Sequence, residues 1–336
     1  MVTDEDRTIG VTDLALFFVA LCLAVFIMAT NATTVLVICR TPALRTMANA
    51  YVCSLACADL VVGAVCVILA IYMLPPFRVD WFDKSEVMCS LLNGLNIGMT
   101  AVSAFNMTLI AFDRYFYIIK PYFYQRNINF RVISISITVV WIAGLVIAFL
   151  PQFIARQYPE CNITNRLPAW YLFYLCTGLF LGLCAVNILL YSVILKVAIK
   201  QHSAVMAATT SVQNPKFDDN DINKKPGGTS QTISKGTMRS IKFFLTVFGC
   251  FFCCLTPMVV VLALDIYVFV PPALYRLLNV VALLNSAMNF LIYAVMNRQF
   301  RQAFLRTSPL GRLCVWACCC CRFRRSGEEG DHTSHW

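Results

Sequence analysis

The stretch Cys89–Pro121, CSLLNGLNIGMTAVSAFNMTLIAFDRYFYIIKP, decides how the rest of the chain is arranged. Its segment Ser90–Phe112 contains no charged residue, and a run of that length is what an α-helix needs to cross a lipid bilayer. At a rise of ~1.5 Å per residue, Cys89 and Arg114 would lie ~37 Å apart, near opposite membrane faces. The stretch therefore predicts a transmembrane helix with a cysteine at one face and the Asp113-Arg114 pair at the other.

The composition predicts a membrane protein with several spans. Hydrophobic residues make up 59% of the 336 residues and charged residues only 13%, with a mean hydropathy of +0.71. A water-soluble domain of this composition would expose large apolar patches. The net charge of +10 does not indicate nucleic-acid binding, because the basic residues concentrate in particular loops, as membrane orientation requires. Most of the seventeen cysteines lie inside apolar runs, where cysteine behaves as a small hydrophobic residue.

Seven windows with almost no charge follow one another along the chain, and each is long enough to span. We therefore expect an all-α membrane protein, a seven-transmembrane helix bundle over residues 14–297. The predicted spans are about 14–39, 48–74, 87–117, 132–154, 168–199, 237–266 and 273–297. Residues 1–13 form an acidic N-terminal segment that does not resemble a signal peptide. Residues 201–235 are polar and are predicted to form a flexible loop between spans five and six.

The distribution of lysine and arginine predicts the orientation of the bundle. If the N-terminus is extracellular, the outer segments hold six of the 27 basic residues, and 21 remain on the cytoplasmic side. The six are Arg7, Arg78, Lys84, Arg156, Arg166 and Arg276. Such a bias is typical of a multi-pass plasma-membrane protein with its N-terminus outside.

The segment after span seven has features of a membrane-surface helix. Phe300 and Phe304 are four residues apart among basic residues, so residues 298–308 are predicted to lie on the inner leaflet. The cytoplasmic tail 309–336 carries five cysteines beside arginines: Cys314, Cys318, Cys319, Cys320 and Cys321. Cysteines in this setting are candidate palmitoylation sites, and reduced, unmodified thiols are the alternative.

Seven spans with this layout resemble the rhodopsin-like (class A) G-protein-coupled receptors, over about residues 14–306. The motifs, one per span, are Asn31, Leu55-Ala56-Cys57-Ala58-Asp59, Asp113-Arg114-Tyr115 with Pro121 after it, Trp141, Tyr191, Pro257 and Asn289-Phe290-Leu291-Ile292-Tyr293. One such motif is weak evidence, but the complete series in order is specific. Phrases such as SLACADLVVG look most similar to the biogenic amine receptors.

The resemblance implies roles for polar residues within the spans. A carboxylate inside a membrane is costly and usually functional. In the family, Asp59 would share a sodium ion with Ser103, Asn285, Ser286 and Asn289, and a water-filled structural network is the alternative. The residues implied in activation and coupling to a heterotrimeric G protein are Asp113, Arg114, Tyr115, Pro121, Tyr122, Tyr191, Asn289 and Tyr293.

Two features with family counterparts fall at the outer face. Cys89 and Cys161 correspond to the disulfide that joins span three to the second outer loop. Asn162-Ile163-Thr164 is a glycosylation sequon in that loop. At the inner face, the start of span six (KGTMRSIK) contains no acidic residue, so the ionic restraint that many relatives form there is expected to be missing and basal activity to be raised.

The implied ligand pocket departs from the amine-receptor pattern. Those receptors hold a protonated amine with an aspartate 18 residues before the Asp113-Arg114-Tyr115 arginine, where this chain has Asn96. An amide cannot supply the charge that stabilises a buried ammonium. The expected pocket residues are Asn93, Asn96, Ile97, Thr100, Leu175, Leu179, Leu255, Met258, Val259 and Asn279. This lining favours a neutral or lipid-like ligand, and the alternative is that these residues only pack.

The sequence therefore predicts a receptor that transmits an extracellular signal to heterotrimeric G proteins. The expected partners are a G protein, arrestin, a small extracellular ligand and membrane lipid, with no nucleic acid and no cofactor beyond the sodium ion. A constitutively active receptor-like protein or a silent dimerisation partner is the alternative. An enzyme or transporter is not expected, because the chain has only three histidines, no multi-ligand metal pattern and no internal repeat.

Overall fold

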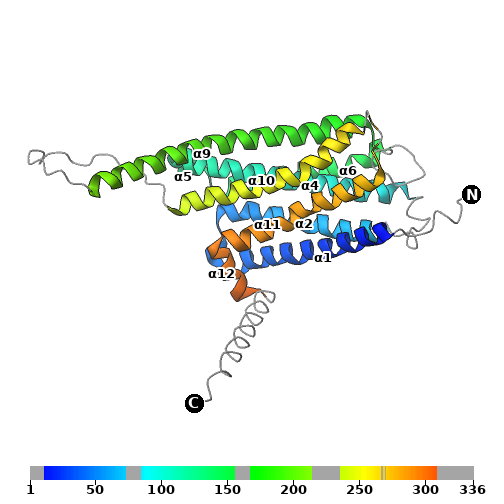
Figure 1. The fold of residues 1–336 in the computed structure, drawn as a ribbon, viewed down its shortest axis with the longest axis horizontal. Helices are drawn as coiled ribbons and strands as arrows, with labels where there is room; N and C mark the ends of the chain where they lie inside the picture. The colour runs from blue at the N-terminus through cyan, green and yellow to red at the C-terminus, as the bar shows by residue number, and fades with distance from the viewer. Residues whose placement is uncertain are drawn as a thin grey trace, which may run out of the picture.

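Among the residues that the computed structural model describes, seven helices are long and apolar enough to cross a membrane. The model describes residues 11–72, 85–155, 167–213, 235–265, 268 and 270–308. The spanning helices pack side by side into an elongated all-helical bundle (Figure 1). The predicted seven-transmembrane fold is thus confirmed.

The first four spans are formed by α1 (Val11–Arg40), α2 (Met47–Tyr72), α4 (Glu86–Ile119) and α6 (Phe130–Phe149), and α6 is extended by the short α7 (Pro151–Ile154). A 3-10 turn, η2 (Pro42–Leu44), joins α1 to α2, and α5 (Pro121–Asn127) joins α4 to α6. The remaining spans are η4 with α9 (Trp170–Thr177 and Gly178–Gln213), α10 (Lys235–Leu264) and α11 (Pro272–Met296), followed by α12 (Arg298–Thr307).

Side chains that cap the first turn fix where several helices begin. Asn129 Oδ1 accepts from Val132 N at 3.1 Å before α6, and Asn297 Oδ1 accepts from Phe300 N at 3.1 Å before α12. Each satisfies one of the backbone N–H groups that a helix start leaves without an intrahelical partner. Asn297 is therefore both the residue at which α11 ends and the cap that begins α12.

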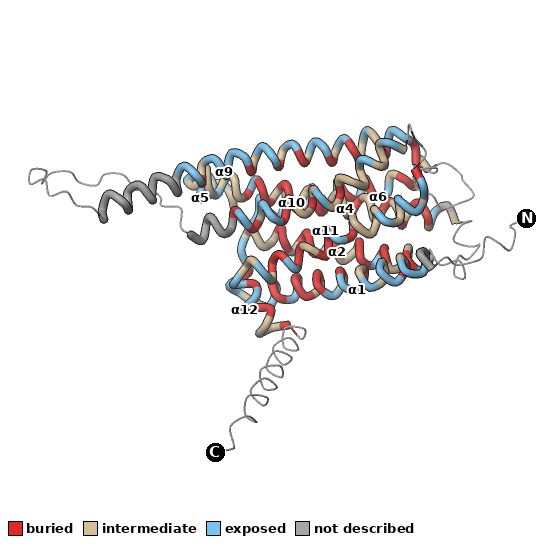
Figure 2. Tube along the Cα trace, in the orientation of Figure 1, coloured by how far each residue is buried: buried red, intermediate tan, exposed pale blue. Residues whose placement is uncertain are grey.

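The central helix of the bundle is α4, which contacts α2, α6, α9 and α10. Its contact with α6 is unusually close. A Cβ atom added at Gly98 would lie 2.5 Å from both Ala148 Cβ and Gly144 O, so the two backbones approach within a distance that only glycine permits. Buried residues lie on the inward faces and exposed apolar residues on the outward faces (Figure 2). Apolar residues on the outward faces suit a bilayer as solvent.

The fifth span, Trp170–Lys200, agrees with its prediction, but its first turn is π-helical and its helix continues beyond the span. It opens with the π-helical turn η4, in which Thr177 Oγ1 donates to Leu172 O five residues earlier at 3.1 Å. At the other end α9 runs to Gln213, so the prediction of a flexible loop from residue 201 is wrong for residues 201–213. The segment HSAVMAATTSVQ is rich in alanine and other helix-compatible residues, and an existing helix propagates through such a sequence readily. Residues 214–234 lie outside the described part of the chain.

Candidate functional site

Asp59, midway along α2, is the centre of a polar cluster that joins three helices. Its Oδ1 accepts hydrogen bonds from Ser103 Oγ of α4 at 3.1 Å and from Ser286 Oγ of α11 at 2.8 Å. Its Oδ2 accepts from Asn289 Nδ2 of α11 at 2.8 Å. The carboxylate is 0% exposed, and three donors compensate for its removal from water.

Two further asparagines border this cluster. Asn31 Nδ2 of α1 donates to Ser286 O at 3.2 Å and to Ile27 O at 3.0 Å, which brings a fourth helix into the network. Asn285 is buried, and its Oδ1 finds no hydrogen-bond partner among the described residues. Carboxylate, hydroxyl and amide oxygens are the donor set that a small hard cation prefers. The structure thus brings Ser103, Ser286 and Asn289 onto Asp59, while Asn285 adds an acceptor that no donor from the described residues occupies.

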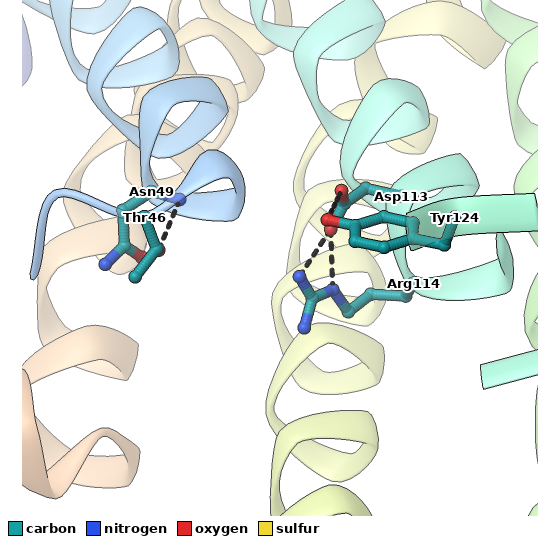
Figure 3. Close-up of polar contacts among 5 residues, drawn as sticks. All are labelled: Thr46, Asn49, Asp113, Arg114 and Tyr124. Atoms are coloured by element: carbon teal, nitrogen blue, oxygen red, sulfur yellow. Dashed lines mark hydrogen bonds and ion pairs between the residues drawn. The ribbon is translucent and has the colours of Figure 1, made fainter. Parts of the chain in front are cut away.

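The second polar group, Asp113, Arg114 and Tyr124, lies where α4 meets α5 (Figure 3). Arg114 Nε donates to Asp113 Oδ2 at 3.0 Å, and Arg114 Nη2 forms an ion pair with the same oxygen. Tyr124 Oη of α5 donates to Asp113 Oδ1 at 2.8 Å. Both carboxylate oxygens are therefore occupied, and the Asp113 side chain is only 2% exposed. Arg114 also lies over the ring of Tyr117, with its guanidinium carbon 5.3 Å from the ring centroid.

Burial raises the pKa of Tyr124 well above its ordinary value, and the neighbouring Asp113 carboxylate raises it further. The hydroxyl therefore keeps its proton near neutral pH and remains a donor. Tyr122, which was predicted for coupling, is 84% exposed. Tyr115 and Pro121 are half-buried beside it. Sequence reasoning missed Tyr124, although a tyrosine three residues after Pro121 in a helical turn was a usable signal.

The two tyrosines predicted for activation are both buried in aromatic surroundings. Tyr191 of α9 packs on Phe248 of α10 with ring centroids 5.7 Å apart. Tyr293 of α11 packs on Phe243 of α10 at 5.0 Å and on Phe300 of α12 at 5.9 Å. The Tyr293 hydroxyl finds no hydrogen-bond partner among the described residues. Each tyrosine therefore contacts α10 through its ring, and the Tyr293 hydroxyl has no hydrogen-bond partner among the described residues.

Phe290 occupies the place of the family's span-seven proline and has a packing role. Its ring meets Phe304 at 5.3 Å and Phe300 at 6.1 Å, both close to edge-to-face. Offset and edge-to-face aromatic pairs add attraction beyond the area they bury. Because α11 runs through Phe290 without a break, this position has no proline kink. Its ring instead packs against α12, an arrangement called the Phe290 clamp below.

The predicted ligand residues divide into two groups. On α4, Asn93 Nδ2 donates to Cys89 O at 3.0 Å and Thr100 Oγ1 donates to Asn96 O at 2.8 Å, so both side chains hydrogen-bond to their own helix. The apolar members pack in hydrophobic clusters between helices: Ile97, Leu175, Leu179, Leu255 and Val259. Met258 is half-buried on α10.

Asn279 lies apart from the other predicted ligand residues. It lines an opening between α1, α2 and α11 that none of them borders. The opening is lined by Leu16, Ala20, Cys66, Leu69, Ala70, Arg276, Asn279, Val280 and Leu283. In the sequence prediction, Arg276 was considered only as one of the basic residues on the outer side. Its i, i+3 spacing from Asn279 already predicts that the two share a helix face.

Several predicted sites fall wholly or partly outside the described residues. Cys89 is disulfide-bonded and buried at the start of α4, while its predicted partner Cys161 lies in the segment that is not described. Asn162 lies in the same segment. The five tail cysteines, Cys314 and Cys318 to Cys321, also lie outside the described residues. The disulfide pairing, the glycosylation and the palmitoylation remain predictions.

A model of the seven-transmembrane receptors of the rhodopsin family matches residues 30–293, which include both polar groups. The chain belongs to this receptor family. It is 24% identical to octopamine receptor beta-2R of Drosophila melanogaster over 93% of this chain, and 28% identical to melatonin receptor type 1B-B of Danio rerio over 82%. It is 26% identical to 5-hydroxytryptamine receptor 6 of Rattus norvegicus, again over 82%.

The receptor spans 64% of the length of the Drosophila protein, 76% of the Danio protein and 66% of the Rattus protein. Its likeness to receptors named for amines agrees with the resemblance expected from the sequence. The relatives are receptors, so the prediction that the chain is not an enzyme is confirmed.

Proposed function

We propose that this receptor sits in the plasma membrane with its N-terminus outside and converts binding of an extracellular ligand into activation of a heterotrimeric G protein. The observation that carries the proposal is the Arg114–Asp113 ion pair with Tyr124 bound to the same carboxylate. It lies at the end of the bundle that also carries α5 and α12 (Figure 1). A cation held there by a neighbouring carboxylate is available to exchange that partner for a protein bound at this face.

The proposed transition has two arrangements of the same residues. In the arrangement described, Asp113 restrains Arg114 and the Tyr293 hydroxyl is buried without a described partner. A buried hydroxyl without a partner costs about 1–3 kcal/mol. In the active arrangement Arg114 leaves Asp113 for the G protein, while Tyr191 and Tyr293 repack and the Tyr293 hydroxyl gains a hydrogen-bond partner. A ligand shifts the balance only by binding one arrangement more tightly than the other.

The Asp59 cluster is proposed to hold a sodium ion that stabilises the resting arrangement. Asp59 supplies the negative charge, and Ser103, Ser286, Asn289 and the unpartnered Asn285 oxygen supply polar atoms around it. Sodium binding would require the Ser103 and Ser286 hydroxyls to turn their lone pairs toward the ion and Asn289 to present its Oδ1 in place of Nδ2. Arrestin is the second proposed cytoplasmic partner, at the same face.

The proposed ligand is neutral or lipid-like. Asn96 replaces the carboxylate that a protonated amine requires, and Ile97, Leu175 and Leu179, predicted for the same pocket, pack against one apolar cluster. The second candidate is a receptor-like protein that signals without a ligand or serves as a dimerisation partner. The absence of acidic residues in KGTMRSIK and the Phe290 clamp favour this candidate, because both alter the family's switch.

A second-messenger screen tests the ligand class. Cells expressing the receptor or Asn96→Asp are challenged with amines, nucleosides, lipids and small neutral metabolites. We expect the unmodified receptor to answer a neutral or lipid-like compound and Asn96→Asp to gain responses to amines. An amine response of the unmodified receptor that Asn96→Asp does not strengthen would contradict the proposal.

A further inference from the structure

Asn187, near the middle of the fifth span, forms a hydrogen bond between two helices in the interior of the bundle. Its Nδ2 donates to Thr108 Oγ1 of α4 at 2.7 Å and to Leu183 O of its own helix at 2.8 Å. Thr108 Oγ1 donates in turn to Ala104 O at 3.1 Å. Asn187 is 2% exposed and Thr108 5%. This polar pair therefore joins α9 to α4, which pack against each other (Figure 1), away from water.

The interface between α4 and α9 is otherwise lined by apolar residues. Buried residues of both helices belong to one core cluster, among them Met107 and Ala111 of α4 and Cys184 and Ile194 of α9. Apolar contact is non-directional, so it does not by itself prescribe one register of a helix on its neighbour. A hydrogen bond of 2.7 Å tolerates only a narrow range of distance and angle. The bond from Asn187 therefore fixes how α9 lies on α4.

The amide of Asn187 is only half satisfied in this arrangement. Its Oδ1 is buried and has no hydrogen-bond partner among the described residues. A leucine would fill a similar volume without leaving a polar atom unpaired, so packing alone does not account for an asparagine here. The side chain thus stabilises the described arrangement through Nδ2 and penalises it through Oδ1. An arrangement of α9 that brought a donor to Oδ1 would compete with it.

Tyr191 follows Asn187 by one turn of α9, at the i, i+4 spacing that places both residues on one helix face. The Tyr191 ring packs on Phe248 of α10 with the centroids 5.7 Å apart, and the Arg114 charge acts on its hydroxyl. The helix contains no proline and runs without a break from Gly178 to Gln213, so a shift at Asn187 carries Tyr191 with it. The position of Tyr191 relative to Arg114 therefore depends on the hydrogen bond that Asn187 makes to α4.

We propose that Asn187 is a positioning residue of the receptor switch. Its hydrogen bond to Thr108 holds α9 on α4 in the arrangement described and keeps Tyr191 against Phe248. When this bond opens, α9 moves on α4, Tyr191 repacks, and the active arrangement becomes more populated. The effect on signalling rests on the proposed function, whereas the effect on the arrangement of the helices does not.

Distances between helices in the receptor alone test the proposal without a G protein. Nitroxide labels on p-acetylphenylalanine, which avoid the seventeen cysteines, are placed at the exposed Ile199 of α9 and Leu245 of α10. Double electron–electron resonance on the full chain in nanodiscs gives the populations of the two arrangements. Thr108→Val removes the acceptor and keeps nearly the same volume. We expect it to raise the minor population about threefold to tenfold, from the usual strength of hydrogen bonds between membrane helices.

Matched variants separate positioning from packing. Thr108→Ser keeps the hydroxyl and should keep the wild-type distance distribution. In an Asn187→Leu receptor, Thr108→Val should have no further effect, because the bond that it removes is already gone. Thr138→Val is the control, since its exposed hydroxyl donates to Ser134 O of its own helix at 2.9 Å, and we expect no change. Nucleotide exchange without ligand should rise in Thr108→Val and stay unchanged in the Thr108→Ser and Thr138→Val receptors.

The proposal is overturned by a Thr108→Val distribution equal to that of Thr138→Val. Lower thermal stability of Thr108→Val with an unchanged distribution would likewise assign the bond to the fold alone. A Thr108→Val effect as large in the Asn187→Leu receptor as in the wild type would show that the two residues act separately. If Asn187→Leu does not fold, the Thr108→Val, Thr108→Ser and Thr138→Val receptors decide the question. A shifted distribution without nucleotide exchange on any G protein contradicts the proposed function and supports the positioning role.

Discussion

At the scale of single residues, two carboxylates organise the receptor, and each is satisfied in a different way. Asp59 is held by three neutral donors from two other helices, whereas Asp113 is held by a cation and a phenol next to it. Neutral donors can be displaced by a cation without leaving a charge behind, while an ion pair must be exchanged for another pair. The first group suits ion binding, and the second suits a switch.

For Asp59, we expect Asp59→Asn to abolish a response to sodium. With the charge gone, a sodium ion loses the attraction that offsets its dehydration. Ligand affinity or basal G-protein activation in NaCl is compared with the same quantity in choline chloride at equal ionic strength. The unmodified receptor should change about severalfold, in line with the usual coupling energies between sites. A sodium effect that survives in Asp59→Asn would contradict the site.

For Tyr124, we expect Tyr124→Phe to weaken the restraint on Asp113 and to raise basal signalling. One hydrogen bond to a charged acceptor contributes about 1.5–3 kcal/mol, and its loss frees Oδ1 of the carboxylate. Tyr122→Phe is the matched control, because that hydroxyl is on an exposed residue. Second-messenger output without ligand is the readout, and equal output from the two variants would exclude the role of Tyr124.

The raised pKa of Tyr124 also sets a pH dependence. A group whose pKa is higher in the folded state than in the unfolded state stabilises the fold at every pH below its unfolded-state pKa, which is about 10 for tyrosine. This stabilisation is lost as the pH rises through the folded-state pKa. The Tyr124–Asp113 bond should therefore be constant between about pH 6 and pH 9. Basal activity of Tyr124→Phe relative to the unmodified receptor should not vary across that window.

At the scale of helices, the packing of α4 on α6 depends on residues without side chains. Gly98→Leu should force the two helices apart and lower the free energy of unfolding by about 1–3 kcal/mol, the usual cost of overpacking. Gly182→Leu is the matched control, since a Cβ at Gly182 of α9 meets nothing within 4 Å. Thermal unfolding of the purified receptors is the measurement. Equal stability of the two variants would contradict the close approach.

The helices themselves could be predicted from charge-free windows, because a bilayer imposes length and polarity on every span. The extent of α9 could not, because HSAVMAATTSVQ leads directly into the polar residues 214–235 and composition does not show where the helix ends. The Asp59 partners Ser103, Ser286 and Asn289 were predicted through the family resemblance, not through spacing. Tyr124 was missed because its partner, Asp113, lies on the neighbouring helix.

At the scale of the whole molecule, α11 links the opening, the Asp59 cluster and the packing against α12. The opening between α1, α2 and α11 shares α11 with the Asp59 cluster, and α11 continues to Tyr293 and the Phe290 clamp. A ligand that shifts α11 can therefore influence both the Asp59 cluster and the ring contacts of Tyr293. We propose that such a shift is passed on to Arg114, which acts on a G protein.

Nucleotide exchange on purified heterotrimeric G proteins tests that claim most directly. The receptor in nanodiscs is assayed against each G-protein class, beside Arg114→Ala and empty nanodiscs, with no ligand added. We predict that the unmodified receptor accelerates exchange on at least one class above empty nanodiscs, because its span six lacks the acidic restraint. Arg114→Ala should return exchange to the background. Exchange that is undiminished in Arg114→Ala, or a receptor equal to empty nanodiscs with every class, would contradict the account.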